Sequence, residues 1–189
     1  MSLARYLASL LNSSGQVDLT TKVVNQLPNA NIAAMAASKL TGQVPDANAP
    51  SGSVIQVVQG TSTTIFTSTT GSYLATGLQA TITPISSSSK ILLISREQLN
   101  GDIDNDGLGD ATGQYALYRN GSMIFQSVST TFARGGLQRI NDGGFKYLDS
   151  PNSTSPLTYA TYLRMSGGSR AVVANNDALS TMILLEIAA

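Results

Sequence analysis

The sequence predicts a mainly β protein, an antiparallel β-sandwich of the jelly-roll type that follows a short, partly helical N-terminal arm. From residue 53 onward, runs rich in Val, Ile, Thr and Tyr alternate with turns rich in Gly, Ser and Asn. About eight such runs follow one another with no helical pattern between them, which is typical of sandwiches and jelly rolls. Before residue 53 the pattern differs, because apolar side chains there recur at helical spacing.

The N-terminal arm is predicted from two amphipathic helical segments and a linker. In the first segment, leucines lie at the spacing of one helical face: Leu3, Leu7, Leu10 and Leu11. Asn29 is a suitable N-cap for a second helix over residues 30–40. The linker ends near residue 52, which divides the chain into an arm, residues 1–52, and a head, residues 53–189. Because isolated helices of this length are marginal in water, we expect the arm to dock on neighbouring subunits. The alternative is a helical pair folded back over the head.

The head is predicted to contain strands over residues 53–59, 63–67, 78–83, 90–97, 145–148, 157–164 and 181–187. The first of these is rich in β-branched residues and is expected to be buried. Asn120-Gly121 lies between two alternating runs, which predicts a type I′ hairpin because both turn residues need a positive φ. The last strand is apolar on both faces, so it is expected either at the centre of a sheet or against another subunit.

The composition excludes several classes of function. The chain has no His and no Cys, so it cannot form a Ser-His-Asp or Cys-His apparatus or a thiolate metal site. Charged residues make up 12% of the chain and their formal net charge is zero, which favours association. The alternative is a neutral monomer. The basic residues are dispersed and the longest apolar runs are strand-sized, so we expect no nucleic-acid or membrane partner.

An acidic loop after residue 101 is the candidate metal site. Its spacing matches the first half of a calcium loop and resembles a thrombospondin type 3 repeat, with these candidate ligands: Asp102, Asp104, Asp106 and Asp110. The twelfth loop position is Gly113 in place of a bidentate Glu, and no helical pattern flanks the loop. A solvated acidic loop is therefore the alternative. Calcium is the one cofactor considered, and none is required.

The same acids do not predict an enzyme. A carboxylate pair for glycoside hydrolysis would lie on a loop, and the sequence offers no aromatic-rich cleft for a sugar because its tyrosines are scattered and Trp is absent. We therefore expect no catalytic residues and a non-enzymatic protein.

Seven short blocks of the chain carry a resemblance to a known family: residues 1–7, 12–17, 39–52, 78–84, 90–93, 117–121 and 181–189. In this order, which is the family's order, they resemble virion proteins of tailed phages, especially phages of cyanobacteria and marine bacteria. The resemblance implies a homotrimeric virion component, assembled in the host cytoplasm, whose N-terminal segment anchors a displayed β-rich head. Its partners would be further copies of itself and either the phage major capsid protein or tail and baseplate proteins. Such heads act as capsid cement or decoration proteins, or as short tail-fibre and receptor-binding heads. The lack of a long shaft favours cement or decoration.

Overall fold

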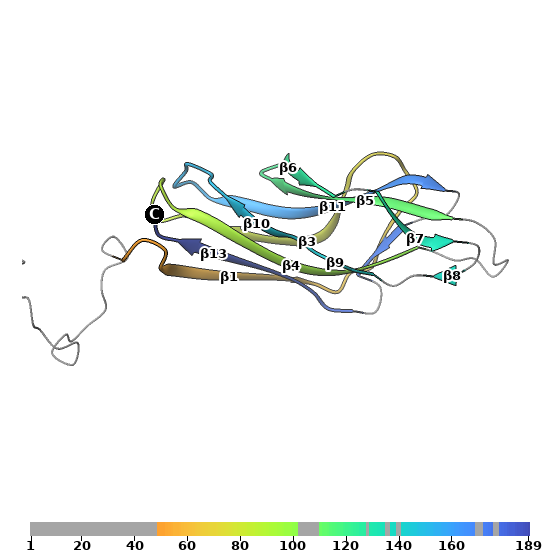
Figure 1. The fold of residues 1–189 in the computed structure, drawn as a ribbon, viewed down its shortest axis with the longest axis horizontal. Helices are drawn as coiled ribbons and strands as arrows, with labels where there is room; N and C mark the ends of the chain where they lie inside the picture. Colours follow the sequence, from red (N-terminus) through yellow and green to blue (C-terminus); the bar gives the residue numbers. More distant parts are fainter. Residues whose placement is uncertain are drawn as a thin grey trace, which may run out of the picture. The chain divides into compact units, whose positions relative to one another are not determined.

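The computed structural model describes residues 49–101, 110–127, 129–134, 137–138, 141–168, 172–175 and 178–189 (Figure 1). Nearly all of the predicted arm, residues 1–52, lies outside this part of the chain, so the arm and its boundary stay predictions. In the described part the strands are β1 (Val54–Ser62), β2 (Phe66–Ser68), β3 (Leu74–Ile82), β4 (Lys90–Gly101), β5 (Ala111–Arg119), β6 (Ser122–Gln126), β7 (Thr130–Arg134), β8 (Leu137–Gln138), β9 (Asn141–Gly143), β10 (Lys146–Asp149), β11 (Leu157–Gly168), β12 (Val172–Ala174) and β13 (Ser180–Ile187).

Eight of these strands form the sandwich, and every pairing between them is antiparallel. The first sheet has the order β1-β13-β4-β10 and the second sheet has the order β3-β11-β5-β6. The first strand of the eight thus pairs with the last, the second with the seventh, the third with the sixth and the fourth with the fifth. This is the strand pairing of a jelly roll. The predicted fold class is confirmed.

Short strands lengthen both sheets at one end of the sandwich. β12 and β9 pair with β4, and β2 pairs with β12, while β7 pairs with β5 and β8 pairs with β7. Four of the short strands were not predicted from the sequence: β7, β8, β9 and β12. The strand expected over residues 63–67 is the shorter β2. Runs of two to five residues such as these carry too few alternating positions to be recognised.

The core lies between the inner faces of the two sheets, because side chains alternate between faces along a strand. Ile91, Leu93 and Leu184 of the first sheet and Tyr159 and Leu163 of the second sheet are fully buried. Burying each large apolar side chain contributes about 1.5–3 kcal/mol, so these alternating positions provide much of the driving force for closing the sandwich.

Two local features follow from the sequence. Asn120 (φ 48°) and Gly121 (φ 79°) form the tight turn between β5 and β6, which confirms the predicted hairpin. At Gly60, β1 comes so close to β3 that an added Cβ would lie 1.9 Å from the carbonyl oxygen of Gln79. Glycine at this position therefore lets two strands of different sheets approach each other along one side of the sandwich.

Two predictions concerned the first and last strands of the head, and one of them is confirmed while the other is wrong. β13 lies between β1 and β4, at the centre of the first sheet, as its apolar character predicted. The prediction of a buried first strand is wrong, since β1 pairs only with β13 among the described strands and its Val54 and Val57 are 50% and 60% exposed. Both faces of β1 carry β-branched residues, so composition alone did not show which side faces outward.

Candidate functional site

The predicted calcium loop lies mostly outside the described residues. Of its four candidate ligands only Asp110 is described, and it is exposed at the position directly before β5. Asp102, Asp104 and Asp106 fall in the part that the structure leaves undescribed, so the calcium site stays a prediction. Elsewhere in the described chain, no group of three acidic residues could hold a metal ion.

The outer face of the first sheet carries a row of apolar side chains across all four strands. Val57 of β1 is opposite Leu185 of β13, Leu185 is opposite Leu92 of β4, and Leu92 is opposite Leu148 of β10. Directly opposite residues point to the same face, so the row is continuous. Neighbouring outward positions extend it into an apolar stripe, which consists of Val57, Leu92, Ile94, Leu148, Ile183, Leu185 and Ile187.

The apolar stripe is accessible and is bordered by cations. Val57, Leu148 and Ile94 are 60%, 51% and 39% exposed. Lys90 and Lys146 are exposed on the same face, beside Ile187 and Ile94. The carboxylates of Glu97, Asp149 and Glu186, which belong to the same strands, are buried on the inner side. The described outer face of β1, β13, β4 and β10 therefore combines exposed aliphatic groups with positive charge.

A buried carboxyl group lies on the opposite, inner face of β4. Glu97 is fully buried and accepts a hydrogen bond from the Tyr115 hydroxyl. Around it, the Thr76 and Thr161 hydroxyls lie 2.6 Å apart, and the amide of Asn175 donates to the carbonyl oxygens of Thr64 and Thr76. The second carboxylate oxygen of Glu97 and Oδ1 of Asn175 have no hydrogen-bond partner among the described atoms.

The environment of Glu97 determines its protonation. Burial raises the pKa of Glu97 above its ordinary value of 4.5, and the nearby hydroxyl groups of Thr76 and Tyr115 oppose this shift only in part. Burial and the neighbouring Glu97 charge raise the pKa of Tyr115 well above 10.0, so the phenol remains a hydrogen-bond donor. Because Glu97 has no exposed surface, no substrate can reach it. The arrangement is suited to holding the two sheets together and not to catalysis.

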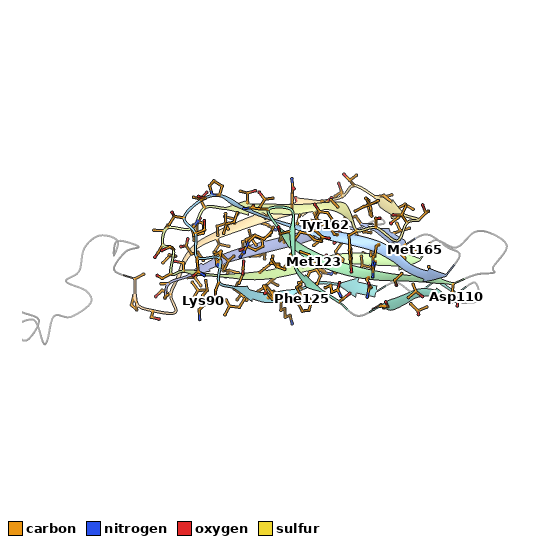
Figure 2. The ribbon with its side chains drawn as sticks, turned by 90° about the horizontal axis from the view of Figure 1, so that it is seen from above. Lys90, Asp110, Met123, Phe125, Tyr162 and Met165 are labelled. Carbon is orange, nitrogen blue, oxygen red and sulfur yellow. The ribbon has the colours of Figure 1, made fainter. Side chains whose placement is uncertain are left out.

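A cluster of tyrosines lies on the outer face of the second sheet, around Arg164 of β11. The rings of Tyr118 and Tyr162 stack with their centroids 3.8 Å apart, and the Arg164 guanidinium carbon lies 4.8 Å from the centre of the Tyr73 ring. Gln114 accepts hydrogen bonds from Nε and Nη2 of Arg164, the former at 2.8 Å. These five residues are called the Tyr–Arg cluster, and Figure 2 labels Tyr162 among the side chains of the head.

The Tyr–Arg cluster was not predictable from the sequence. Tyr73 precedes β3, Tyr118 is on β5 and Tyr162 is on β11, so the three rings are far apart along the chain. Their meeting depends on the pairing of β11 with both β3 and β5. Three tyrosines that are far apart in the sequence are therefore neighbours in the folded head.

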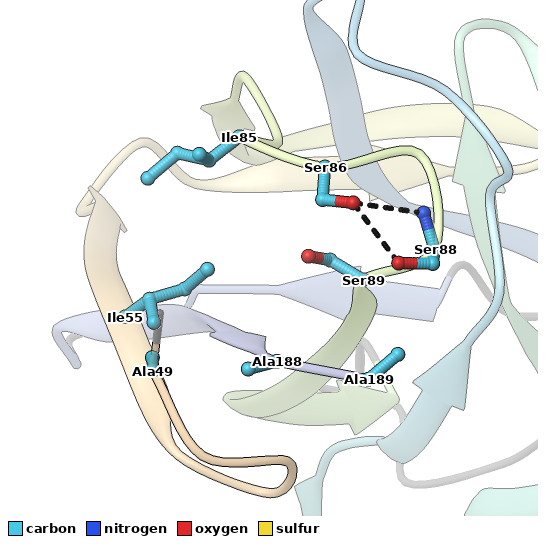
Figure 3. Close-up of a pocket in the computed structure, with 8 residues that line it drawn as sticks. All are labelled: Ala49, Ile55, Ile85, Ser86, Ser88, Ser89, Ala188 and Ala189. Atoms are coloured by element: carbon cyan, nitrogen blue, oxygen red, sulfur yellow. Dashed lines mark hydrogen bonds between the residues drawn. The ribbon is translucent and has the colours of Figure 1, made fainter. Parts of the chain in front are cut away.

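A cavity of about 320 Å³ opens at the end of the head where residue 49 enters (Figure 3). Ile55 and Ile85 lie on one side, and Ser86, Ser88 and Ser89 lie on the other. Its lining has no charged side chain. No helix in the described part of the chain is long and apolar enough to cross a membrane.

Comparison with known proteins finds distant structural similarity to viral capsid proteins. No protein-family model matches the chain, and no curated protein matches it in sequence. A mutant VP2 protein of infectious bursal disease virus matches with a TM-score of 0.33 and 14% identity, over 71% of this chain and 36% of that one. The Gt strain structure of the same virus matches with a TM-score of 0.36 and 15% identity, over 79% of this chain and 42% of that one. This chain thus spans less than half the length of the chains that it matches.

Proposed function

We propose that this protein is a non-enzymatic structural component of a phage virion, a homotrimeric cement or decoration protein that binds the shell through its N-terminal arm. The observation that carries the proposal is the apolar stripe. An exposed, contiguous apolar face of this kind marks an interaction surface, because isolated soluble domains rarely present one. The resemblance of the sequence blocks to phage virion proteins supplies the biological setting.

The occupant of the apolar stripe is a second copy of this chain. Three strands of roughly eight residues and the four residues of β10, at about 3.4 Å per residue and about 4.8 Å between strands, give a face of about 450 Å². A standard stable interface buries about 800 Å² on each partner, so this face supplies more than half of one. The low charge content of the chain and its zero net charge leave little long-range repulsion between copies.

The cations beside the stripe constrain how two copies meet. Lys90 is on β4 and Lys146 is on β10, whereas the described outward side chains of β1 and β13 carry no charge. Contacts centred on β1 and β13 bury the aliphatic groups and leave both lysines at the rim, where water screens them. A cyclic trimer is compatible with this placement, since its contacts join two different patches, here two parts of the first sheet, and need not oppose like charges.

The test is the mass of the full-length protein in solution, measured by light scattering after size-exclusion chromatography. We expect a trimer for the wild type and dissociation for Val57→Glu, which places a charge on the most exposed side chain of the stripe, on the edge strand β1. Gln79→Glu is the matched control, because it introduces the same side chain at an exposed position of β3, which belongs to the second sheet and lies outside the stripe. A monomeric wild type, or equal masses for the two variants, would show that the stripe does not join copies.

The anchoring role of the arm has a separate test. Leu7→Asp and Leu10→Asp in the full chain should abolish binding to purified shells that lack this protein, while the head keeps its β-sheet circular dichroism spectrum. Undiminished decoration by these variants would contradict the anchoring arm.

A short tail-fibre or receptor-binding head is the second candidate function, and the half-buried Tyr–Arg cluster favours it. Tyrosine and arginine are enriched where proteins recognise partners. Copy number on the intact virion separates the candidates: hundreds of copies on the shell indicate cement, and a few at the tail indicate a fibre.

A further inference from the structure

The strands of the second sheet and its extension contain no Lys, Asp or Glu. This holds for β3, β5, β6, β7, β8 and β11. Arg164 is therefore a cation without a carboxylate on its own sheet, and its hydrogen bonds in the structure go to neutral acceptors, Gln114 and the carbonyl oxygen of Gly71. A charge held in a fixed position without a counter-charge is available to a ligand.

The Tyr–Arg cluster offers donors more than acceptors. A guanidinium has five N–H groups. Nε, Nη1 and Nη2 of Arg164 each use one, which leaves one N–H on each of the two terminal nitrogens. The side-chain oxygen of Gln114 is already occupied by Arg164, and its amide nitrogen donates to no described atom. The complementary ligand is therefore rich in oxygen acceptors and carries a negatively charged group that can accept two parallel hydrogen bonds.

The tyrosine rings add flat apolar surface beside these donors. Tyr118 and Tyr162 stack at an interplanar angle of 21°, and Ala116, the cross-strand neighbour of Tyr162, is fully buried. The Tyr73 hydroxyl lies 3.3 Å from the side-chain oxygens of Gln114 and Gln126, which holds its ring in place. The side chains are thus fixed before a ligand arrives, and binding costs little conformational entropy.

The geometry points to the Tyr–Arg cluster as a binding site for a carboxylated saccharide, a sugar of the hexuronate class. Its carboxylate accepts two hydrogen bonds from Arg164, a hydroxyl accepts from the Gln114 amide, and the C–H face of its ring packs on Tyr162. A sugar with one carboxylate and several hydroxyls matches one cation surrounded by neutral donors and aromatic rings.

Two other occupants fit less well. A second copy presenting the same face would bring Arg164 against Arg164 and donors against donors. An acidic peptide is favoured by several cations, whereas Arg164 is the single described cation in the cluster. The site is separate from the proposed assembly surface, which is on the first sheet, and it is compatible with either a cement protein or a fibre head.

The test is calorimetric titration of the full-length protein with tri-galacturonate, with maltotriose and tri-glutamate as the neutral and peptide comparisons. We expect tri-galacturonate to bind and both comparisons to bind at least about tenfold more weakly, since a hydrogen bond to a charged group is worth that much or more. Arg164→Gln should weaken tri-galacturonate binding by about tenfold or more on the same grounds.

Two further variants keep the result interpretable. Arg164→Lys retains the charge but lacks the planar guanidinium that can donate two parallel hydrogen bonds, so it should also weaken binding. Lys146→Gln removes a cation from the opposite sheet and should leave binding unchanged. The proposal is overturned by any of four results. These are no binding at millimolar tri-galacturonate, wild-type affinity in Arg164→Gln or Arg164→Lys, equal affinity for maltotriose, or equal affinity for tri-glutamate, which would indicate a peptide site.

Discussion

Replacing Glu97 by Gln should change how the stability of the head depends on pH. Because burial raises the pKa of Glu97 in the folded head, the carboxyl group keeps its proton to a higher pH there than in the unfolded chain. Its contribution to stability is fully present below the unfolded pKa, 4.5, and is lost as the pH rises through the folded pKa. Glutamine resembles the protonated carboxyl in shape and cannot ionise. The stability of the variant should therefore not show this decrease as the pH rises.

The magnitude follows from the linkage between protons and folding. Between the two pKa values, the free energy of unfolding falls by at most about 1.4 kcal/mol per pH unit. For a domain of this size that corresponds to about 5 °C in melting temperature per pH unit. Glu186 does not mask the effect. Burial opposes its ionisation, but hydrogen bonds from Gln56 and from the backbone of Ile85 and Ser86 lower its pKa, so its contribution is lost only as the pH falls below 4.5.

The assay is thermal unfolding, followed by circular dichroism at pH values from about 5 to about 8. The wild-type melting temperature should fall relative to that of Glu97→Gln as the pH rises, until the folded pKa is passed. Asp46→Asn, in the predicted linker, is the control for loss of one carboxylate and should retain the wild-type slope. Parallel curves for wild type and Glu97→Gln across this range would refute the assignment of Glu97 as a buried, readily protonated carboxyl.

Two more predictions concern the backbone and the acidic loop. Gly60→Ala should destabilise the head by about 1–3 kcal/mol or more in urea unfolding, because its Cβ meets backbone and not a movable side chain. Gly71→Ala is the control, since its nearest atom is 4.0 Å away, and equal effects of the two variants would contradict the close approach of β1 and β3. For the predicted calcium loop, added calcium should raise the melting temperature, and both chelation and Asp104→Asn should remove the increase; an unchanged melting temperature would identify a solvated loop.

The sequence predicted the long strands and the tight hairpin because their signals are local. In β11 and β13, buried and partly exposed positions alternate along most of the strand, and this alternation is visible in the residues themselves. Asn120-Gly121 carries its own turn preference. The position of β1 at the edge of the first sheet was not predictable in this way, because it depends on which strands pair and not on the composition of β1.

The candidate sites were harder to predict than the fold, since each is assembled from distant parts of the chain. Glu97 lies only five residues before Asp102 of the acidic loop, yet the alternation along β4 turns it inward, toward Tyr115 of the opposite sheet. The polar groups around it come from strands whose neighbourhood in the fold was not predictable from the sequence. An acidic residue inside a strand with apolar neighbours at alternate inward positions was the one available signal.

The two outer faces of the sandwich differ in chemistry, and this difference links the two proposals. The first sheet exposes aliphatic side chains whose burial is favourable against almost any apolar surface, which suits permanent contact between copies. The second sheet exposes oriented donors and aromatic rings, which suit a ligand of defined shape. If copies associate through the first sheet, the Tyr–Arg cluster of each copy stays accessible. Val57→Glu should then dissociate the oligomer without changing the affinity for tri-galacturonate, and Arg164→Gln should do the reverse. A variant that altered both properties together would show that the two faces are not independent.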